Sequence, residues 1–346
     1  MRRRGRGDGS VRVTIGDVAA LAGVSTATVS RALTRPDMVS GPRAVRVQAA
    51  AARLGYMPNP AARALASLRT GLVGVLVSIL DEHRHALALP VIQSRLDAAG
   101  YAALVAVTGA GADEVAAATR RMAAREVYGL LFLGCGAPRG LEALLRTPRV
   151  AQVVCDGGEG VRDGTEAGSS GARCGIDYEL AGAMVGHYLA GLGHRRAAAL
   201  GVGTADRRTA RFLDGARAGF LAAGGRQWMP APAGRALPHA LGDWLAAPAP
   251  PTAIVCGDDL TALAALRACN AAAAVSGRIS VVGCGDDPFA RLATPALTTV
   301  RVPMVDLAHF AVATLLAAMA GNAPPAAGRL GCKLIVRQST GPGPEV

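Results

Sequence analysis

The sequence lacks the features that would place it among membrane, secreted or zinc-binding proteins. No apolar run of about 18 residues is free of a breaker, so we expect no membrane span. The basic N-terminus leads into no apolar stretch, so we expect no secretory signal. The seven cysteines include no Cys-x-x-Cys pair, which argues against a structural zinc site and is typical of reduced thiols in the cytosol.

Catalytic motifs are missing as well. Two Gly-x-Gly pairs, Gly109–Gly111 and Gly201–Gly203, follow predicted strands, but neither completes the Gly-x-Gly-x-x-Gly pattern of dinucleotide-binding folds. The sequence has no phosphate-binding loop, nucleophile elbow or zinc-protease motif. We therefore expect no enzyme, no catalytic residue, no metal and no cofactor. A doubly wound enzyme is the distant alternative, and a transport binding protein would not explain the basic N-terminal region described next.

Positive charge is concentrated at one end of the chain. The 346 residues are enough for two or three domains, and the net charge is +12. Most of this excess lies in residues 1–70, which hold twelve arginines and three aspartates. A biased nucleotide composition of the gene would explain why Lys333 is the single lysine, but not why the positive charge is concentrated at one end of the chain. A cationic head on a near-neutral body indicates a polyanion-binding module joined to a separate domain.

The spacing predicts two short helices at the start of this head. Thr14 begins the first with a capping-box pattern that includes Asp17, and Gly23 ends it. Ser25 begins the second helix almost at once. Two such helices form a helix-turn-helix, and the small and hydroxyl residues on the outer face of the second suit close approach to a DNA groove.

Two further helical segments follow. Ser40 is expected to cap a third helix, with Pro42 in its first turn and Gly55 at its end. The Ala-rich stretch 61–67 allows only about two turns, and a helix of that length is marginal alone in water.

The rest of the chain alternates between strands and helices. Leu72–Val77 is a continuous apolar run, as in a strand buried on both faces. The alternation predicts parallel sheets covered by helices on both faces, and two such sets predict two doubly wound lobes with a ligand cleft between them. The expected strands are 72–77, 102–107, 129–133, 151–155, 197–201, 252–256 and 280–283, and the expected helices are 92–99, 112–125, 139–145, 178–192, 210–224 and 260–273.

The run from Val13 to Leu33, followed in register by Val39-Ser40, 53–59 and 62–65, resembles the lac repressor (LacI/GalR) family of bacterial transcription regulators. Family landmarks continue at 192–196, 256–260, 280–283 and 295–300. The resemblance implies an all-α helix-turn-helix head plus an α/β core of two doubly wound parallel-sheet lobes, periplasmic-binding-protein-like. It implies a cytoplasmic repressor that binds double-stranded operator DNA as a homodimer.

The resemblance also implies a domain organisation. The expected parts are a basic arm (1–12), a helix-turn-helix domain (13–57), a hinge helix (58–70), a core (71–340) and a tail (341–346), with one core lobe at 71–172 and 302–328 and the other at 173–300 and 329–340.

DNA-contacting roles follow from the resemblance, position by position. Thr26 and Ala27 match positions that read base edges, and Arg31 matches an arginine that can donate two hydrogen bonds to guanine. Leu65 matches the hinge leucine that wedges into the minor groove. The full expected set is Thr14, Ser25, Thr26, Ala27, Thr28, Ser30, Arg31, Tyr56, Asn59, Arg63 and Leu65.

The expected ligand is a small polar metabolite between the lobes. Gly285 stands where many sugar-responsive relatives have Asp, and the region around Asp206 and the C-terminal segment most resemble gluconate-operon repressors. Fewer pocket carboxylates would ease binding of an anion, so a sugar acid such as gluconate is the first expectation. A neutral sugar or a nucleoside or purine-type effector is the alternative. Phe212 stands where the resemblance places an effector-clamping arginine, and the neighbours Arg207 and Arg211 are the candidates to replace that arginine. The expected effector-binding residues are Ser78, Glu82, Asp156, Arg207, Arg211, Asp258 and Asp286.

The Asp81–His85 segment and the C-terminal tail are not expected to have specialised roles. The His-x-His of Asp81–His85 could bind a metal, but no second cluster has ligand spacing, and we expect a solvated loop at the mouth of the cleft. The tail has no heptad repeat, which argues against a tetramerising coiled coil. The operator, the choice between inducer and co-repressor, and the choice between dimer and tetramer stay open.

Overall fold

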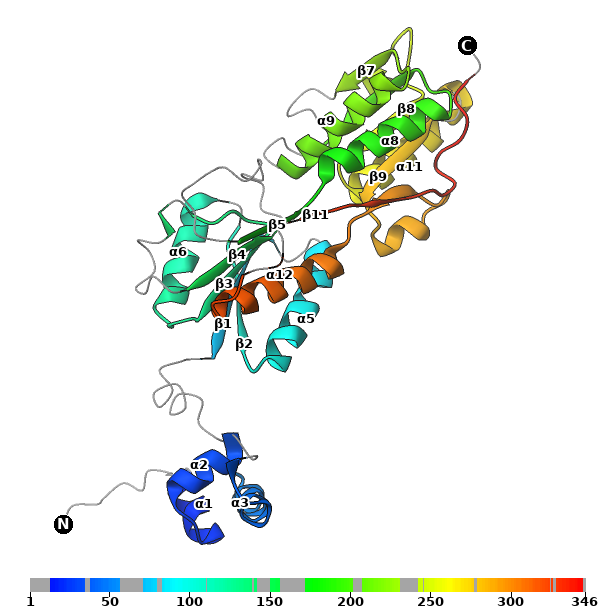
Figure 1. The fold of residues 1–346 in the computed structure, drawn as a ribbon. Coiled ribbons are helices and arrows are strands. Elements are labelled where there is room, and N and C mark those ends of the chain that lie inside the picture. Colours follow the sequence, from blue (N-terminus) through cyan, green and yellow to red (C-terminus); the bar gives the residue numbers. More distant parts are fainter. Residues whose placement is uncertain are drawn as a thin grey trace, which may run out of the picture. The chain divides into compact units, whose positions relative to one another are not determined.

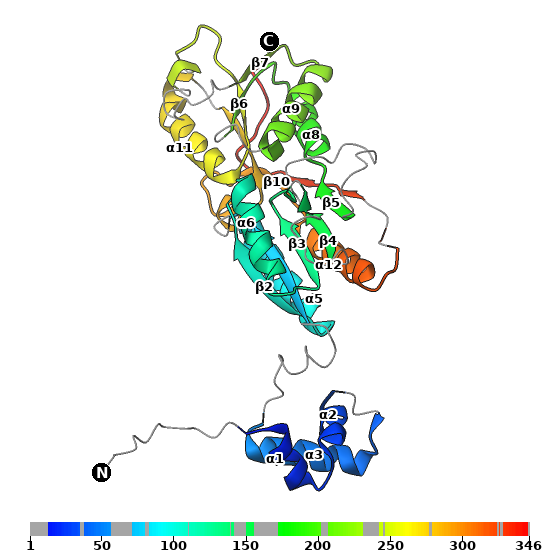
Figure 2. The same ribbon diagram turned by 90° about the vertical axis from the view of Figure 1, so that its left-hand side faces the viewer.

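The computed structural model divides the chain into two compact units, residues 1–70 and 71–346, which are drawn in Figures 1 and 2. No helix in the described part of either unit is long and apolar enough to cross a membrane. The structure describes residues 13–34, 38–56, 71–79, 83–109, 111–138, 140–141, 150–155, 172–201, 207–230, 242–244, 246–276, 279–323, 325 and 328–344.

The first unit is a small helical domain with its own core. In its described residues, three helices meet around side chains such as Val18, Val29 and Val47, each with no exposed surface. The helices are α1 (Ile15–Ala22), α2 (Thr26–Thr34) and α3 (Gly41–Leu54).

The ends of these helices follow from local chemistry. Thr14 and Asp17 form the expected capping box: the Thr14 backbone N–H donates to the Asp17 carboxylate at 2.7 Å, and the Asp17 N–H donates back to the Thr14 hydroxyl. Gly23 (φ 64°) and Gly55 (φ 62°) end α1 and α3 in the left-handed conformation that favours glycine. Ser40 occupies the N-cap of α3, but its side chain makes no capping hydrogen bond, contrary to expectation.

The second unit begins with a six-stranded sheet in the order β11-β5-β4-β3-β1-β2. Side chains alternate between its faces: Val73 and Val75 of β1 pack toward α5 and α12, whereas Leu76 packs toward α6. Helices therefore cover both faces of this first lobe (Figures 1 and 2). Its elements are β1 (Leu72–Val77), α5 (His83–Ala98), β2 (Ala102–Val107), α6 (Ala112–Ala123), β3 (Gly129–Leu133), β4 (Ala151–Cys155), β5 (Ala172–Ile176), α12 (Met304–Met319) and β11 (Arg329–Leu330).

The second lobe repeats the plan. Its sheet has the order β12-β10-β9-β8-β6-β7, and only β12 runs antiparallel to its neighbour. Val255 faces α8 and α9, and Ile254 faces α11. Its elements are α8 (Tyr178–Gly191), β6 (Arg196–Leu200), α9 (Arg207–Ala222), β7 (Gln227–Pro230), β8 (Ala253–Cys256), α11 (Asp259–Ser276), β9 (Ser280–Gly285), the 3-10 helix η2 (Pro288–Arg291), β10 (Thr298–Arg301) and β12 (Lys333–Ile335).

Four glycines allow α8 and α9 to pack backbone against backbone. A Cβ at Gly182 or Gly186 of α8 would collide with main-chain atoms of α9, and one at Gly215 or Gly219 would collide with main-chain atoms of α8. The helices therefore approach more closely than any larger side chain at these positions would permit.

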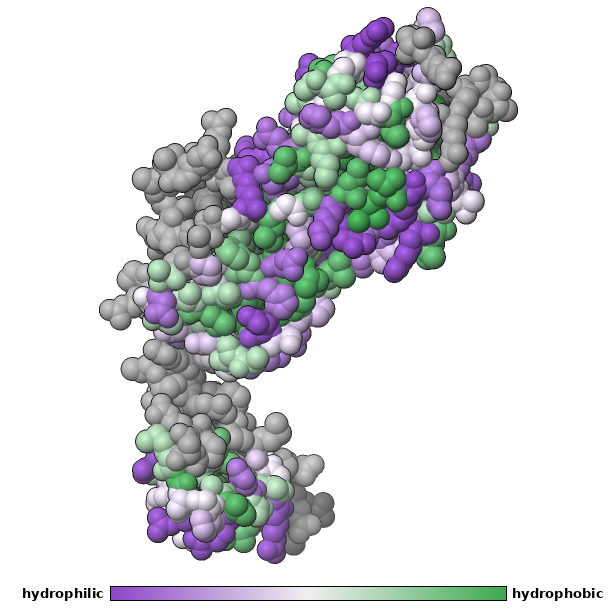
Figure 3. Space-filling model, turned by 45° about the vertical axis from the view of Figure 1, so that its right-hand side comes forward, coloured by the Kyte–Doolittle hydropathy of each residue, from purple (hydrophilic) through white to green (hydrophobic). Residues whose placement is uncertain are grey.

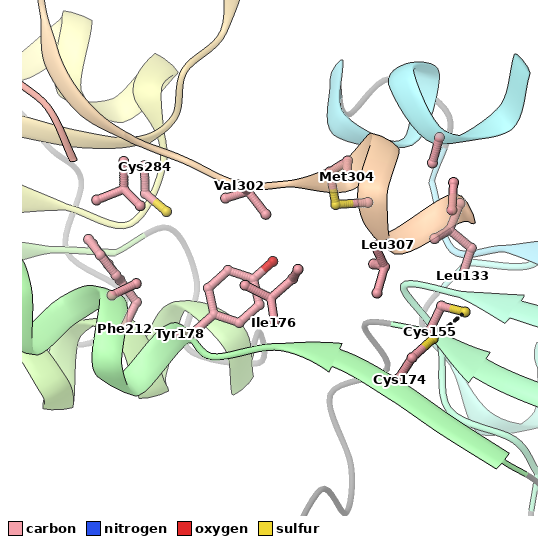
Figure 4. Close-up of a cluster of buried hydrophobic side chains, with 14 of the residues drawn as sticks. Leu133, Cys155, Cys174, Ile176, Tyr178, Phe212, Cys284, Val302, Met304 and Leu307 are labelled. Atoms are coloured by element: carbon pink, nitrogen blue, oxygen red, sulfur yellow. Dashed lines mark hydrogen bonds between the residues drawn. The ribbon is translucent and has the colours of Figure 1, made fainter. Parts of the chain in front are cut away.

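The chain passes between the two sheets after β5, after β10 and after β11. Buried apolar side chains surround the first two crossings, and Figure 4 shows Ile176 and Tyr178 beside Val302 and Met304. The Arg84 guanidinium of α5 also donates to the Tyr178 hydroxyl at 3.4 Å, which joins the first lobe to the start of α8.

The sequence-based elements of the core are largely confirmed, with clear exceptions. The strands β5, β7, β10, β11 and β12, the 3-10 helix η2 and the helix α12 were not among the expected elements, and α5 and α9 begin earlier, at His83 and Arg207. His83 and His85 therefore lie in the first turn of a helix and not in a loop, and His85 has no exposed surface. The helix expected at 139–145 lies mostly outside the described residues.

Candidate nucleic-acid interface and ligand site

The second helix of the head has one buried and one exposed face. Val29 and Ala32 are buried in the head core. Thr26, Ala27 and Arg31 are exposed on the other face, together with Ser30. Apart from Arg31, the side chains on this face are short, so the helix backbone can approach a DNA groove closely.

Hydrogen bonds order the beginning of this face. The Ser25 hydroxyl accepts the backbone N–H of Thr28 at 3.2 Å, and the two hydroxyl groups lie 2.9 Å apart. The Arg31 Nε donates to the Ala27 carbonyl at 3.3 Å, which keeps the side chain along its own helix. These hydroxyls and this guanidinium can exchange internal partners for phosphate or base-edge acceptors without exposing a buried polar group.

The other predicted DNA contacts divide into two groups. Thr14 is tied into the capping box by donating its hydroxyl to Asp17, and Tyr56 is half-buried against the head core, so both also support the fold. Asn59, Arg63 and Leu65 lie outside the described residues.

At the carboxyl ends of the first lobe's strands, Ser78 is buried and its backbone N–H donates to Leu133 at 3.1 Å. A Cβ at Gly134 would lie 2.6 Å from both the Ser78 hydroxyl and the His85 ring, so glycine leaves the space that these polar groups occupy. Glu82 and Asp156, which were expected here, lie outside the described residues.

At the matching edge of the second lobe, the first turn of α9 sits over the ends of β6 and β8. A Cβ at Gly201 would lie 3.1 Å from the Thr209 methyl group, and one at Gly257 would also collide with Thr209. Arg207 is exposed and Arg211 is half-buried on this helix. Helix N-termini favour anions, so this turn is suited to a negatively charged group. Phe212 is wholly buried and faces the core, so it cannot replace an effector-clamping arginine.

Asp258 acts first as a helix cap. Its carboxylate accepts the backbone N–H and the hydroxyl of Thr261, both at 2.7 Å, at the beginning of α11.

Asp286 is held by two arginines. Arg301 Nε lies 2.6 Å and an Arg337 terminal nitrogen 2.5 Å from its carboxylate oxygens. Its backbone has φ 56°, which is uncommon for a residue other than glycine. Both Asp258 and Asp286 therefore have protein partners at this edge.

Asp259 was not singled out from the sequence, yet it organises the turn that follows β9. Its carboxylate accepts the Thr299 hydroxyl and, at 2.8 Å, the backbone N–H of Asp287. Burial raises the pKa of Asp259 to about 6, against the opposing effect of these two hydrogen bonds. The burial of Asp259 could have been inferred from helical spacing, because Asp259 lies one turn before Ala262 on the buried face of α11.

Gly285 is required by backbone geometry. Its φ of +149° disfavours any side chain, and a Cβ there would lie 3.3 Å from Asp259 Oδ2 and 3.4 Å from Asp287 Oδ1. Burial raises the pKa of Asp287, and the positive charges of His83 and Arg84 from the other lobe act in the opposite direction. Carboxyl groups therefore surround Gly285 although it carries none.

No metal site is formed by the described residues, since no three His, Cys, Asp or Glu side chains among them come together in a suitable group. The His85 Nδ1 lies 2.6 Å from the Ile79 carbonyl oxygen, which makes this histidine part of the packing beneath the first turn of α5.

Two family signatures match the sequence. Residues 14–59 match "Bacterial regulatory proteins, lacI family", and residues 187–340 match "Periplasmic binding protein-like domain". The chain is 32% identical over 341 residues to the HTH-type transcriptional regulator GntR of Pseudomonas aeruginosa, covering 95% of this chain and 96% of that protein. It is 31% identical over 345 residues to the HTH-type transcriptional repressor PurR of Escherichia coli, covering 96% and 98%.

Solved structures show the same fold. The lac repressor dimer bound to operator and the anti-inducer ONPF has a TM-score of 0.79 at 26% identity, covering 95% of this chain and 99% of that one. The transcription regulator GntR from Chromobacterium violaceum has a TM-score of 0.66 at 28% identity, covering 78% and 98%. The expected helix-turn-helix head and periplasmic-binding-protein-like core are thus confirmed.

Proposed function

The chain belongs to the lacI family of bacterial regulatory proteins, and from this premise we propose that it represses transcription in the cytosol under the control of a sugar acid bound between its core lobes. It is a DNA-binding transcription regulator and not an enzyme.

The observation that carries the DNA-binding role is the exposed face of α2. Thr26, Ala27 and Arg31 are exposed on a helix whose opposite side is fixed in the head core by Val29 and Ala32. A recognition helix needs this combination of a rigid inner face and a low outer face with hydrogen-bonding groups.

An operator-binding experiment tests this assignment. Arg31→Ala should weaken binding to the protein's own promoter by about 1–3 kcal/mol and relax the preference at one base pair in each half-site. Arg46→Ala is the matched control, because it removes the same charge from an exposed position on α3. If Arg31→Ala and Arg46→Ala weaken all single-base variants of the operator equally, Arg31 does not read a base.

We propose a homodimer, with one head on each half of a near-palindromic operator. The core carries exposed apolar side chains, and Figure 3 shows one such green area bordered by hydrophilic residues. Apolar surface of this kind is typical of a protein interface. The solved lac repressor neighbour is described as a dimer on its operator. Sedimentation of the full chain at micromolar concentration, with and without operator, would show a monomer if this is incorrect.

The sugar-acid proposal rests on the edge of the second lobe. Arg207 begins α9 and Arg211 lies one turn further along the helix, so two arginines stand near a helix N-terminus, which favours a carboxylate. Two nearby acids are already engaged, Asp258 by Thr261 and Asp286 by two arginines, which lessens the repulsion that an anion would meet.

A neutral sugar is the second candidate, and the carboxyl group beside Gly285 favours it. Asp287 is half-buried next to this glycine and can accept hydroxyl groups of an uncharged ligand. Calorimetric titration with gluconate and with glucose compares an acid and a neutral sugar on one carbon skeleton. Stronger binding of the acid supports the proposal, and equal or stronger binding of glucose rejects it while leaving the family assignment intact.

A further inference from the structure

Two adjacent strands of the first lobe bring a pair of cysteines into contact. Cys155 of β4 and Cys174 of β5 are directly opposite each other in the parallel register. Their sulfur atoms lie 3.0 Å apart, and Figure 4 shows them facing one another. Neighbouring strands are about 4.8 Å apart, which is within the Cα separation of about 4.4–6.8 Å that a disulfide spans. To be joined, the two sulfurs have to approach by only about 1 Å, to the S–S bond length of about 2.0 Å.

We propose that Cys155 and Cys174 form an oxidation site that peroxides convert into a disulfide. One thiol, as its thiolate, attacks the peroxide, so that an S–O bond forms, the O–O bond breaks and water or an alcohol leaves. The second thiol then attacks the sulfenic sulfur, so that the S–S bond forms and the S–O oxygen leaves as water with the remaining proton. Two electrons pass from the thiols to the peroxide, and two molecules of a small thiol such as glutathione can return them, becoming a disulfide themselves.

The position of the pair gives the disulfide a structural consequence. The strand β5 continues through Ile176 into the first crossing between the lobes, and Tyr178 begins the next helix in the buried cluster there. The other edge of β5 pairs with β11, which leads to the third crossing. A bond from Cys174 to Cys155 ties the first of these crossing strands to β4, and so restrains the region through which the lobes are connected.

The other cysteines provide an internal comparison. Cys332 is half-buried, whereas the remaining six are buried. If oxidation followed exposure alone, Cys332 would react first. If it follows proximity, as we propose, the buried pair is joined in preference to Cys332.

The experiment treats the full-length protein with hydrogen peroxide, alkylates the remaining thiols after unfolding, and locates any disulfide by peptide mapping. We expect five of the seven cysteines to stay alkylatable, with a mass loss of about 2 Da for the two hydrogens. The cross-link should join the peptides that contain Cys155 and Cys174, and Cys332→Ser should leave it unchanged. Seven alkylated cysteines, or oxidation confined to Cys332, would overturn the proposal without any need for a folded variant.

A second measurement tests the restraint. In the oxidised protein, backbone amides of residues 172–178 should exchange more slowly with solvent than in the reduced protein, and dithiothreitol should restore the faster rate. Cys155→Ser should show no such difference after peroxide treatment. Equal exchange in the oxidised and reduced wild-type protein would show that the bond does not restrain this crossing. Neither measurement depends on an operator or an effector.

Discussion

Replacing the buried carboxyl group of Asp259 with an amide should change how the stability of the protein depends on pH. Asp259 is wholly buried, and its pKa is raised from 3.8 to about 6. Between these two pH values the folded protein keeps a proton that the unfolded chain has already lost. The free energy of unfolding contributed by this group is therefore fully present below pH 4 and is lost as pH rises through 6.

The size of the effect follows from the shift. A difference of about 2 pKa units corresponds to roughly 3 kcal/mol, at about 1.4 kcal/mol per unit. In the variant Asp259→Asn the amide would not titrate, yet it can still accept the Asp287 N–H and donate to the Thr299 hydroxyl, which preserves the two contacts of the carboxylate. The free energy of unfolding of Asp259→Asn should thus gain on the order of 2–3 kcal/mol relative to the wild type between pH 4 and pH 8.

Urea denaturation of both proteins across this pH range measures the difference, since carboxyl groups elsewhere contribute equally to both. Thr299→Val provides a second check. It removes a hydroxyl that lowers the pKa of Asp259, so the fall in stability should move to higher pH. Parallel pH profiles for the wild type and Asp259→Asn would refute the reasoning, because they would mean that Asp259 has the same pKa folded and unfolded.

Three other predictions follow from local features. His194 forms hydrogen bonds with Thr252, Ser280 and the Gly341 carbonyl, and burial lowers its pKa. As pH falls, the unfolded chain therefore binds the proton first, and the free energy of unfolding should decrease below about pH 6.5. His194→Gln should flatten that part of the pH profile measured by denaturation. Gly215→Ala should destabilise the core by several kcal/mol, on the order of an overpacked interior site, whereas Gly191→Ala in α8, which meets no neighbour, should be nearly neutral; equal thermal shifts would contradict the close helix packing. Leu65→Ala should weaken operator binding and leave the effector affinity of the free protein unchanged. Amide exchange in residues 59–67 of the unaltered protein should be slower with operator DNA than without it. Slow exchange without DNA would exclude a hinge that folds on binding.

The sequence predicted the architecture because its strongest signals are periodic. Short apolar runs such as Leu72–Val77 are typical of strands buried on both faces, and their alternation with helical segments predicts parallel sheets. The missed strands lack such runs. In β5 the residues include Arg173 and Gly175, and β7 is an edge strand that ends at Pro230. Their conformation is fixed by pairing with neighbours, which a single strand does not encode.

The start of α5 was missed for a related reason. Its first residues are His83, Arg84 and His85, which read as polar loop, and Pro90 interrupts the helical pattern. In the structure His85 is buried, and Arg84 donates to the Tyr178 hydroxyl. Tyr178 and Gly134, which lie beside Arg84 and His85, are distant in sequence, so the polar character of this segment could not reveal these environments.

The charges at the carboxyl ends of the second lobe's strands, where we propose the ligand site, show why one missing carboxylate says little about the charge of the effector. From the sequence, Gly285 suggested a site with less negative charge. The structure gives that glycine a backbone reason, its φ of +149°, and surrounds it with Asp259 and Asp287. What matters for an anion is how much of the nearby negative charge already has a partner, and Asp286 is paired with Arg301 and Arg337 while Asp259 is favoured toward its protonated form by burial. The proposed preference for an acid over a neutral sugar therefore rests on these pairings and on the arginines of α9. A substitution at Gly285 would strain the backbone there, so its effect on binding would not report on charge alone.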